Sequence, residues 1–144
     1  DTNAVSYSAR GTKYGDVVRT SDVAITTDRS KNTGGKGQGV TSTGLYMSAL
    51  AVSCSQAVRE AAKRMSLDDV RVEVNHNGDG TFTRLITLYG DLSEDEVETL
   101  RAAGAASTVD GYVKKGEIET TVETASLERR RRQNKLHRAE RLGK

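Results

Sequence analysis

The chain has 144 residues, of which 35% are hydrophobic and 4% aromatic, with one cysteine and no proline. This length fits one domain with a tail, and the apolar content predicts a small core of Val, Leu, Ile and Ala. A single cysteine excludes a domain held by internal disulfides, and no apolar run is long enough for a membrane span. No signal-peptide pattern opens the sequence, so we expect a soluble, cytoplasmic protein without membrane association.

The formal net charge of +2 is unevenly distributed along the chain. Residues 128–144 carry eight Lys or Arg and two Glu, whereas residues 1–127 carry 14 basic and 18 acidic side chains. We therefore expect a mildly acidic domain over residues 1–125 and a basic tail, helical or disordered, over residues 126–144. The tail can contact nucleic acid electrostatically. No aromatic residue lies among its charges, so a solvated or partner-facing tail is the preferred interpretation.

The first third of the sequence predicts short strands followed by a loop. Alternation of apolar and polar residues indicates a strand over residues 4–9, and β-branched runs indicate strands over 17–19 and 23–27. Residues 30–39, SKNTGGKGQG, read as a polar, glycine-rich loop. Its glycine spacing matches neither a P-loop nor a dinucleotide-binding motif, so no phosphate-bearing cofactor is predicted.

A long amphipathic helix is predicted after this loop. Ser42 or Thr43 can cap its start, and apolar residues recur at spacings of three or four along residues 44–65. This face contains Met47, Leu50, Cys54, Val58, Ala61 and Met65. The only thiol of the chain therefore lies on an apolar helix face, where it is either a core residue or a reagent.

A β-hairpin is predicted over residues 70–89. Valines alternate with polar residues in its first strand, and the sequence HNGDG supplies residues that tolerate a tight turn. His76 lies at this turn, and the second histidine, His137, lies in the tail. The two histidines are too few and too far apart to form a metal site with Cys54, so no metal is predicted.

The last part of the domain predicts a helix and a strand. Ser93 and Glu96 form a capping box for a helix that we expect to run to about Ala103 and to stop at Gly104. Residues 107–115 are ambiguous, and alternation over residues 117–123 predicts a final strand. Strands, helix, hairpin, helix and strand in this order predict an α+β fold.

This order of elements resembles the OsmC/Ohr family, the osmotically inducible protein C and organic hydroperoxide resistance proteins. The resemblance covers roughly residues 7–123 and is carried by the glycine-rich loop, the mid-helix cysteine, the valine-rich hairpin and the helix start GDLSEDE. It implies antiparallel sheets wrapped around a long central helix in an intertwined homodimer. It also implies thiol-dependent reduction of organic or hydrogen peroxides in a bacterial response to oxidative stress.

The resemblance also assigns candidate site residues. Cys54 falls on the family's peroxide-attacking cysteine, and Arg29, with Lys13 as the alternative, falls near the family's arginine beside the thiol. The chain departs from the family at two places, since Ser107 stands where a second, resolving cysteine is usual, and residues 42–44 lack the usual glutamate. A peroxidase cycle through Cys54 would therefore need an external thiol as reductant.

Three functions of different classes remain open from the sequence. The first is a thiol peroxidase that acts through Cys54. The second is a catalytically inactive dimer of the same fold that binds a ligand or partner, which a core-packed Cys54 would favour. The third is an interaction protein whose basic tail engages nucleic acid or acidic proteins. The position of the only thiol favours the peroxidase.

Overall fold

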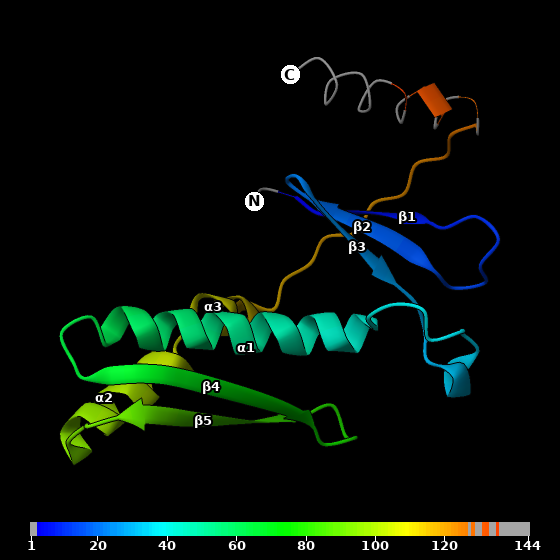
Figure 1. Ribbon diagram of the computed structural model, residues 1–144. Helices are drawn as coiled ribbons and strands as arrows, with labels where there is room; N and C mark the ends of the chain where they lie inside the picture. The colour runs from blue at the N-terminus through cyan, green and yellow to red at the C-terminus, as the bar shows by residue number, and fades with distance from the viewer. Residues whose placement is uncertain (1–2, 127, 129–130, 133–134, 136–144) are drawn as a thin grey trace.

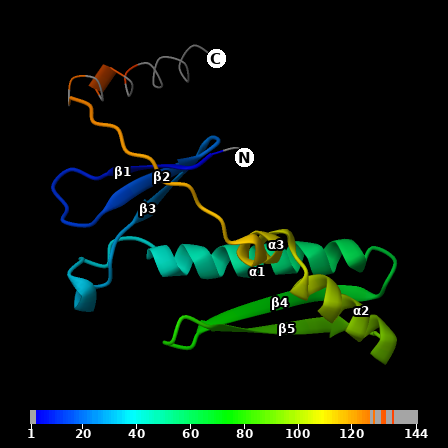
Figure 2. The same ribbon diagram turned by 180° about the vertical axis from the view of Figure 1, so that it is seen from behind.

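The computed structural model describes residues 3–126, 128, 131–132 and 135. It confirms the α+β class, with antiparallel strands and three α-helices within these residues. The elements in chain order are β1 (Val5–Ser8), β2 (Asp16–Thr20), β3 (Val23–Thr27), a 3-10 turn (Lys31–Thr33), α1 (Ser42–Ala61), β4 (Leu67–His76), β5 (Phe82–Gly90), α2 (Glu94–Ala105) and α3 (Thr108–Lys115). Figures 1 and 2 show a three-stranded sheet that stands apart from a body in which α1 lies across the β4–β5 hairpin.

The three strands predicted at the start of the chain form an antiparallel sheet in the order β1-β2-β3. Val5 pairs with Arg19, and Thr20 pairs with Val23 across a two-residue turn in which Ser21 has a positive φ of 46°. No strand residue of this sheet is fully buried. The sheet is therefore open on both faces in the single chain.

The glycine-rich loop that follows is organised by one buried carboxylate. Asp28 Oδ1 accepts the backbone N–H of Arg29 at 2.7 Å, and Oδ2 accepts those of Lys36 at 3.0 Å and Gln38 at 3.3 Å. Desolvation opposes ionisation here, but these three donors outweigh it and lower the pKa of Asp28. One side chain, Asp28, thus holds three backbone N–H groups of this loop.

Helix α1 begins close to the predicted position. Its N-cap is Thr41, one residue before the expected Ser42, and the Thr41 hydroxyl accepts the N–H of Gly44 at 2.9 Å. The helix buries Leu50, Cys54 and Val58 along one face. Ala62, and not the expected Ala61, completes this face. The predicted apolar face is otherwise confirmed at these positions.

The hairpin and the capping box of α2 are confirmed. Strands β4 and β5 pair from Leu67–Gly90 to His76–Phe82, and Ser93 and Glu96 cap each other's backbone at the start of α2. The core lies where α1 and α2 meet the hairpin. Its buried members are Cys54, Val58, Ala62 and Leu100, with Met65, Leu67, Val70, Val72, Ile86, Leu88 and Leu92 packed around them.

The predicted end of the second helix needs correction, and the residues left ambiguous after it form a helix. Helix α2 continues to Ala105, so Gly104 does not end it but lies buried inside its last turn. A Cβ at Gly104 would lie only 3.0 Å from Cys54 Sγ, so glycine is required there by the close approach of α2 to α1. The ambiguous residues 107–115 form α3, which begins with a capping box between Ser107 and Asp110.

The final strand predicted over residues 117–123 is wrong for the single chain. These residues have no regular secondary structure, and Ile118 and Val122 are 92% and 89% exposed. A strand needs a neighbour for its backbone hydrogen bonds, and no strand pairs with this segment in the part of the chain that the structure describes. Most of the predicted tail, residues 126–144, lies outside the described residues.

Candidate functional site

Cys54 lies in the middle of α1 and is completely buried. Its side chain packs in the core with Val58 and Leu100, and α2 approaches so closely at Gly104 that an added Cβ there would lie 3.0 Å from the sulfur. Burial raises the pKa of the Cys54 thiol; the positive charge of Arg84 acts against this rise and the negative charge of Asp110 adds to it. In the single chain the sulfur is therefore held mainly as the neutral thiol at neutral pH.

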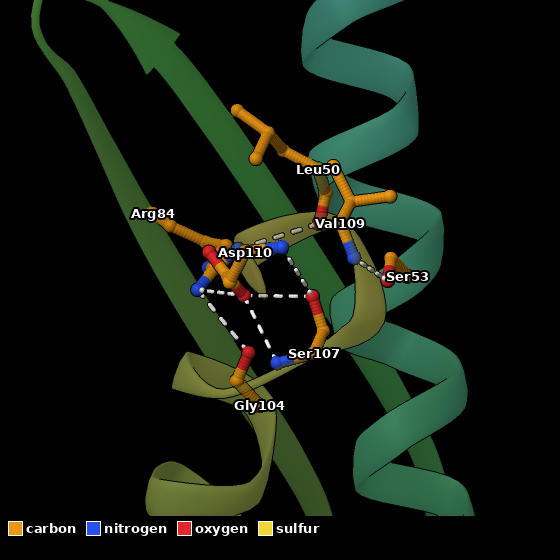
Figure 3. Close-up of polar contacts among 7 residues, drawn as sticks. All are labelled: Leu50, Ser53, Arg84, Gly104, Ser107, Val109 and Asp110. Carbon is orange, nitrogen blue, oxygen red and sulfur yellow. Dashed lines mark hydrogen bonds and ion pairs between the residues drawn. The ribbon is translucent and has the colours of Figure 1, made fainter. Parts of the chain in front are cut away.

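A polar cluster lies beside this core, where α1, β5 and α3 meet (Figure 3). We call it the Arg84 cluster, and its side chains are those of Ser53, Arg84, Ser107 and Asp110. Arg84 Nη2 donates to the carbonyl of Gly104 and to Asp110 Oδ2, both at 3.1 Å. The ion pair is largely shielded from water, since the two side chains are 19% and 18% exposed.

The guanidinium of Arg84 joins the backbone on both sides of the thiol. Its Nη1 donates to the carbonyl of Leu50, one helical turn before Cys54, at 3.5 Å. Its Nη2 donates to the carbonyl of Gly104, the residue at which α2 approaches the thiol. Arg84 is thus fixed between the two segments that enclose Cys54.

Ser107 and Asp110 hold α3 against this arginine. The hydroxyl of Ser107 donates to Asp110 Oδ2 at 2.7 Å, and the Ser107 N–H donates to the same oxygen at 3.1 Å. Desolvation works against the charge of Asp110, but Ser107 and Arg84 outweigh it and lower the pKa of Asp110. The Val109 N–H donates to Ser53 Oγ at 3.1 Å. Helix α3 buries no residue fully, so these polar contacts account for much of its attachment.

The arginine and lysine predicted for the site lie elsewhere in the single chain. Arg29 is exposed after β3, and its guanidinium stacks 4.0 Å from the ring centroid of Tyr14. Lys13 Nζ lies 5.4 Å from the same ring. One copy of the chain therefore does not bring either cation to Cys54, and a role for Arg29 at the thiol stays a prediction that requires a second copy.

Sequence reasoning missed Arg84, although the sequence contains a signal for it. Phe82, Arg84, Ile86 and Leu88 alternate along β5, so they share the face that packs toward the helices. A charged residue at an inward-facing position of an otherwise apolar strand usually has a specific partner. The partners here are Asp110 and two backbone carbonyls.

Other site types find less support. Within the described residues, no group of three or more His, Cys, Asp or Glu side chains is placed to hold a metal ion, and no helix is long and apolar enough to cross a membrane. A cavity of about 250 Å³ lies between α1 and β4. Its lining is Ala51, Val52, Ser55, Arg59 and Val72, and Cys54 is not part of it.

The fold is that of OsmC-like and Ohr proteins. Searches with the sequence match no protein-family model and no curated protein. The structure is similar to that of an OsmC-like protein from Mycoplasma pneumoniae, with a TM-score of 0.63, 15% identity and coverage of 86% of this chain and 96% of that one. A protein from Psychrobacter arcticus 273-4, described as an osmotic stress induced and detoxification response protein, also gives a TM-score of 0.63, with 17% identity and coverage of 78% and 88%. An organic hydroperoxide resistance protein OsmC from Legionella pneumophila gives 0.54, with 20% identity and coverage of 79% and 89%.

Proposed function

We propose that this chain is a thiol peroxidase that reduces organic or hydrogen peroxides through Cys54. The Cys54 thiolate attacks one peroxide oxygen, the O–O bond breaks, and the departing oxygen takes up a proton to leave as an alcohol or water. Cys54 is then a sulfenic acid. A small external thiol condenses with it to a mixed disulfide and releases water, and a second such thiol restores Cys54 and leaves as the oxidised disulfide.

The observation that carries this proposal is the position of Arg84, whose guanidinium is held by the carbonyls of Leu50 and Gly104 on the two helices that pack around the only thiol. Cys54 lies on α1, and the charge of Arg84 acts on it against the effect of burial. A cation beside a thiol favours the thiolate, which is the reactive form. The names of the structural neighbours, which include an organic hydroperoxide resistance protein, support the same chemistry.

We further propose that the active unit is a homodimer in the cytoplasm. The open faces of the β1–β3 sheet and the exposed Ile118 and Val122 are apolar surfaces that a second copy would cover. In such a dimer Arg29 of one copy would approach Cys54 of the other and stabilise the departing peroxide oxygen. In this proposal Arg29 comes from the other copy, because its own chain does not bring it to the sulfur.

A second candidate is favoured by a specific observation. Cys54 is completely buried and its thiol pKa is raised, which is the pattern of a packing residue. On this reading the chain is a catalytically inactive member of the fold that binds a ligand or partner. The basic tail, which lies largely outside the described residues, would then be the natural candidate for contact with nucleic acid or acidic proteins.

The two candidates are separated by peroxide consumption with the full chain. Cumene hydroperoxide or hydrogen peroxide is supplied with dithiothreitol, and the peroxide remaining is measured over time for the wild type and for Cys54→Ser. The proposal requires catalytic turnover in the wild type that the serine variant lacks. Ser55→Ala, a change on the next residue of α1 that leaves the thiol intact, serves as the matched control and should retain turnover.

Mass spectrometry of the same samples identifies the chemical step. Without an external thiol, one equivalent of peroxide should add one oxygen to Cys54, and further peroxide should convert it irreversibly to the sulfinic acid. A native thiol that resists both peroxide and iodoacetamide until the chain is denatured would reject the peroxidase. That result would support the inactive, ligand-binding candidate instead.

A further inference from the structure

We propose that Arg84 is a positioning residue that promotes loss of the proton from Cys54, and that Asp110 restrains this effect. The inference deepens the proposed peroxidase and rests on it for its biological meaning, but the ionisation of the thiol can be measured without any peroxide. It also gives a role to α3, because this helix carries Asp110. The site would thus contain a cation from its own chain, Arg84, whose effect on the thiol is reduced by Asp110. Any residue that a partner supplies would act in addition to this cation.

The geometry fixes the guanidinium close to the thiol. Arg84 donates to the carbonyl of Leu50, one helical turn before Cys54, and to that of Gly104, a residue so close to the thiol that an added Cβ would lie 3.0 Å from Cys54 Sγ. These bonds hold the charge at the edge of an apolar pocket that water does not reach, since Cys54 is fully buried. Charges act more strongly across such a medium than across water.

Asp110 opposes Arg84 in two ways. Its carboxylate forms an ion pair with Nη2 of Arg84 at 3.1 Å, which neutralises part of the positive charge. Its own negative charge also acts on the thiol and disfavours the thiolate. The hydroxyl of Ser107 holds this carboxylate in place. The charges that act on the thiol are thus one cation from β5 and one anion from α3. Helix α2 and strand β4 pack uncharged side chains against this core, namely Leu100, Val70 and Val72.

Substitutions of Arg84 and Asp110 should therefore shift the pH midpoint of Cys54 alkylation in opposite directions. The rate of Cys54 alkylation by iodoacetamide is measured from pH 6 to 10 in Arg84→Gln, Arg84→Lys and Asp110→Asn. Arg84→Gln should shift the pH midpoint upward and slow alkylation at pH 7 by roughly three- to tenfold, the effect of removing one partly screened charge near a thiol. Arg84→Lys should keep the midpoint near that of the wild type. Asp110→Asn should shift it downward and speed alkylation.

The direction of the Arg84→Gln effect separates electrostatics from loss of structure. Local unfolding exposes the sulfur and would speed alkylation, whereas loss of the cation slows it. For Asp110→Asn the matched control is Ser53→Ala, which removes the hydroxyl that accepts the Val109 N–H and so loosens α3 without changing any charge or any hydrogen bond of Asp110. Arg101→Gln removes an arginine from an exposed ion pair with Glu98 on α2 and should leave the pH midpoint unchanged.

The outcomes that overturn the inference are distinct from failure of the proposed function. Faster alkylation of Arg84→Gln, or an unchanged midpoint, would show that Arg84 acts on the thiol only as a structural residue. Equal shifts in Asp110→Asn and Ser53→Ala would reject the restraint by Asp110. If the midpoints shift as expected but the wild type consumes no peroxide, the effect of Arg84 and Asp110 on the thiol is supported and the proposed peroxidase activity is rejected.

Discussion

Replacing Gly104 with alanine should destabilise the protein, although alanine is the better helix former. Gly104 lies inside α2, so the substitution gains about 1 kcal/mol of helix propensity. The new Cβ would lie 2.8 Å from Ile86 Cδ1 and 3.0 Å from both Cys54 Sγ and Val58 Cγ2. The Ile86 methyl can turn aside, but Val58 and Cys54 are fixed on the buried face of α1. Overpacking of this kind costs about 1–3 kcal/mol, so a net loss of about 1 kcal/mol is expected.

Gly111→Ala is the matched control for this prediction. Gly111 also lies within a helix, α3, and no atom lies within 4 Å of the position that its Cβ would take. Alanine should therefore stabilise the protein there by about 0.5–1 kcal/mol. Subtracting one variant from the other removes most of the propensity effect and leaves the cost of packing against Cys54.

Urea unfolding followed by circular dichroism measures both variants at equal protein concentration. In thermal melts the expected difference corresponds to about 2–4 °C per kcal/mol for a chain near this size. Equal stabilisation by Gly104→Ala and Gly111→Ala would refute the close contact between α2 and the thiol. Combining Gly104→Ala with Cys54→Ala should recover part of the loss, because the sulfur that the new methyl meets is gone.

Three further predictions follow from other parts of the structure. The pKa values of Asp28 and Asp110 are lowered on folding, so the stability that they contribute is present above their ordinary pKa of 3.8 and is lost as the pH falls below it. The melting temperature should therefore drop between pH 6 and 2.5, and it should drop less steeply in Asp28→Asn than in the wild type. Ser93→Ala should cost about 1 kcal/mol in urea unfolding, because it removes the N-cap of α2, and an unchanged midpoint would argue against the capping box. Removal of residues 126–144 should change the melting temperature little, since this basic segment has few apolar side chains; if it unfolds the domain, the tail is part of the packing.

The sequence predicted the elements whose signals are local. The hairpin follows from strict alternation along Val70, Val72 and Val74, and the start of α2 follows from the spacing of Ser93 and Glu96. Both depend on residues that are close along the chain. The apolar face of α1 was predictable for the same reason, and Cys54 lies on that buried face.

The sequence did not predict features that depend on contacts between segments distant along the chain. Gly104 looks like a helix stop, but its role comes from the approach of α1, which no local signal contains. Residues 117–123 alternate like a strand, but no strand among the described residues pairs with them. The inward position of Arg84 follows from the alternation along β5, but its pairing with Asp110, 26 positions away, does not. Such pairs become visible only when the topology is known.

If two copies associate as proposed, the open β1–β3 sheet provides a way to measure that association. Strands of four or five residues with no fully buried side chain hold their amide hydrogens weakly against exchange with deuterium. The amides of α1, β4 and β5, which enclose the core, should exchange far more slowly at any protein concentration. Exchange rates in the sheet would instead fall as the protein concentration rises. The ratio of the exchange rate in the sheet to that in the core would then measure the fraction of chains in the dimer.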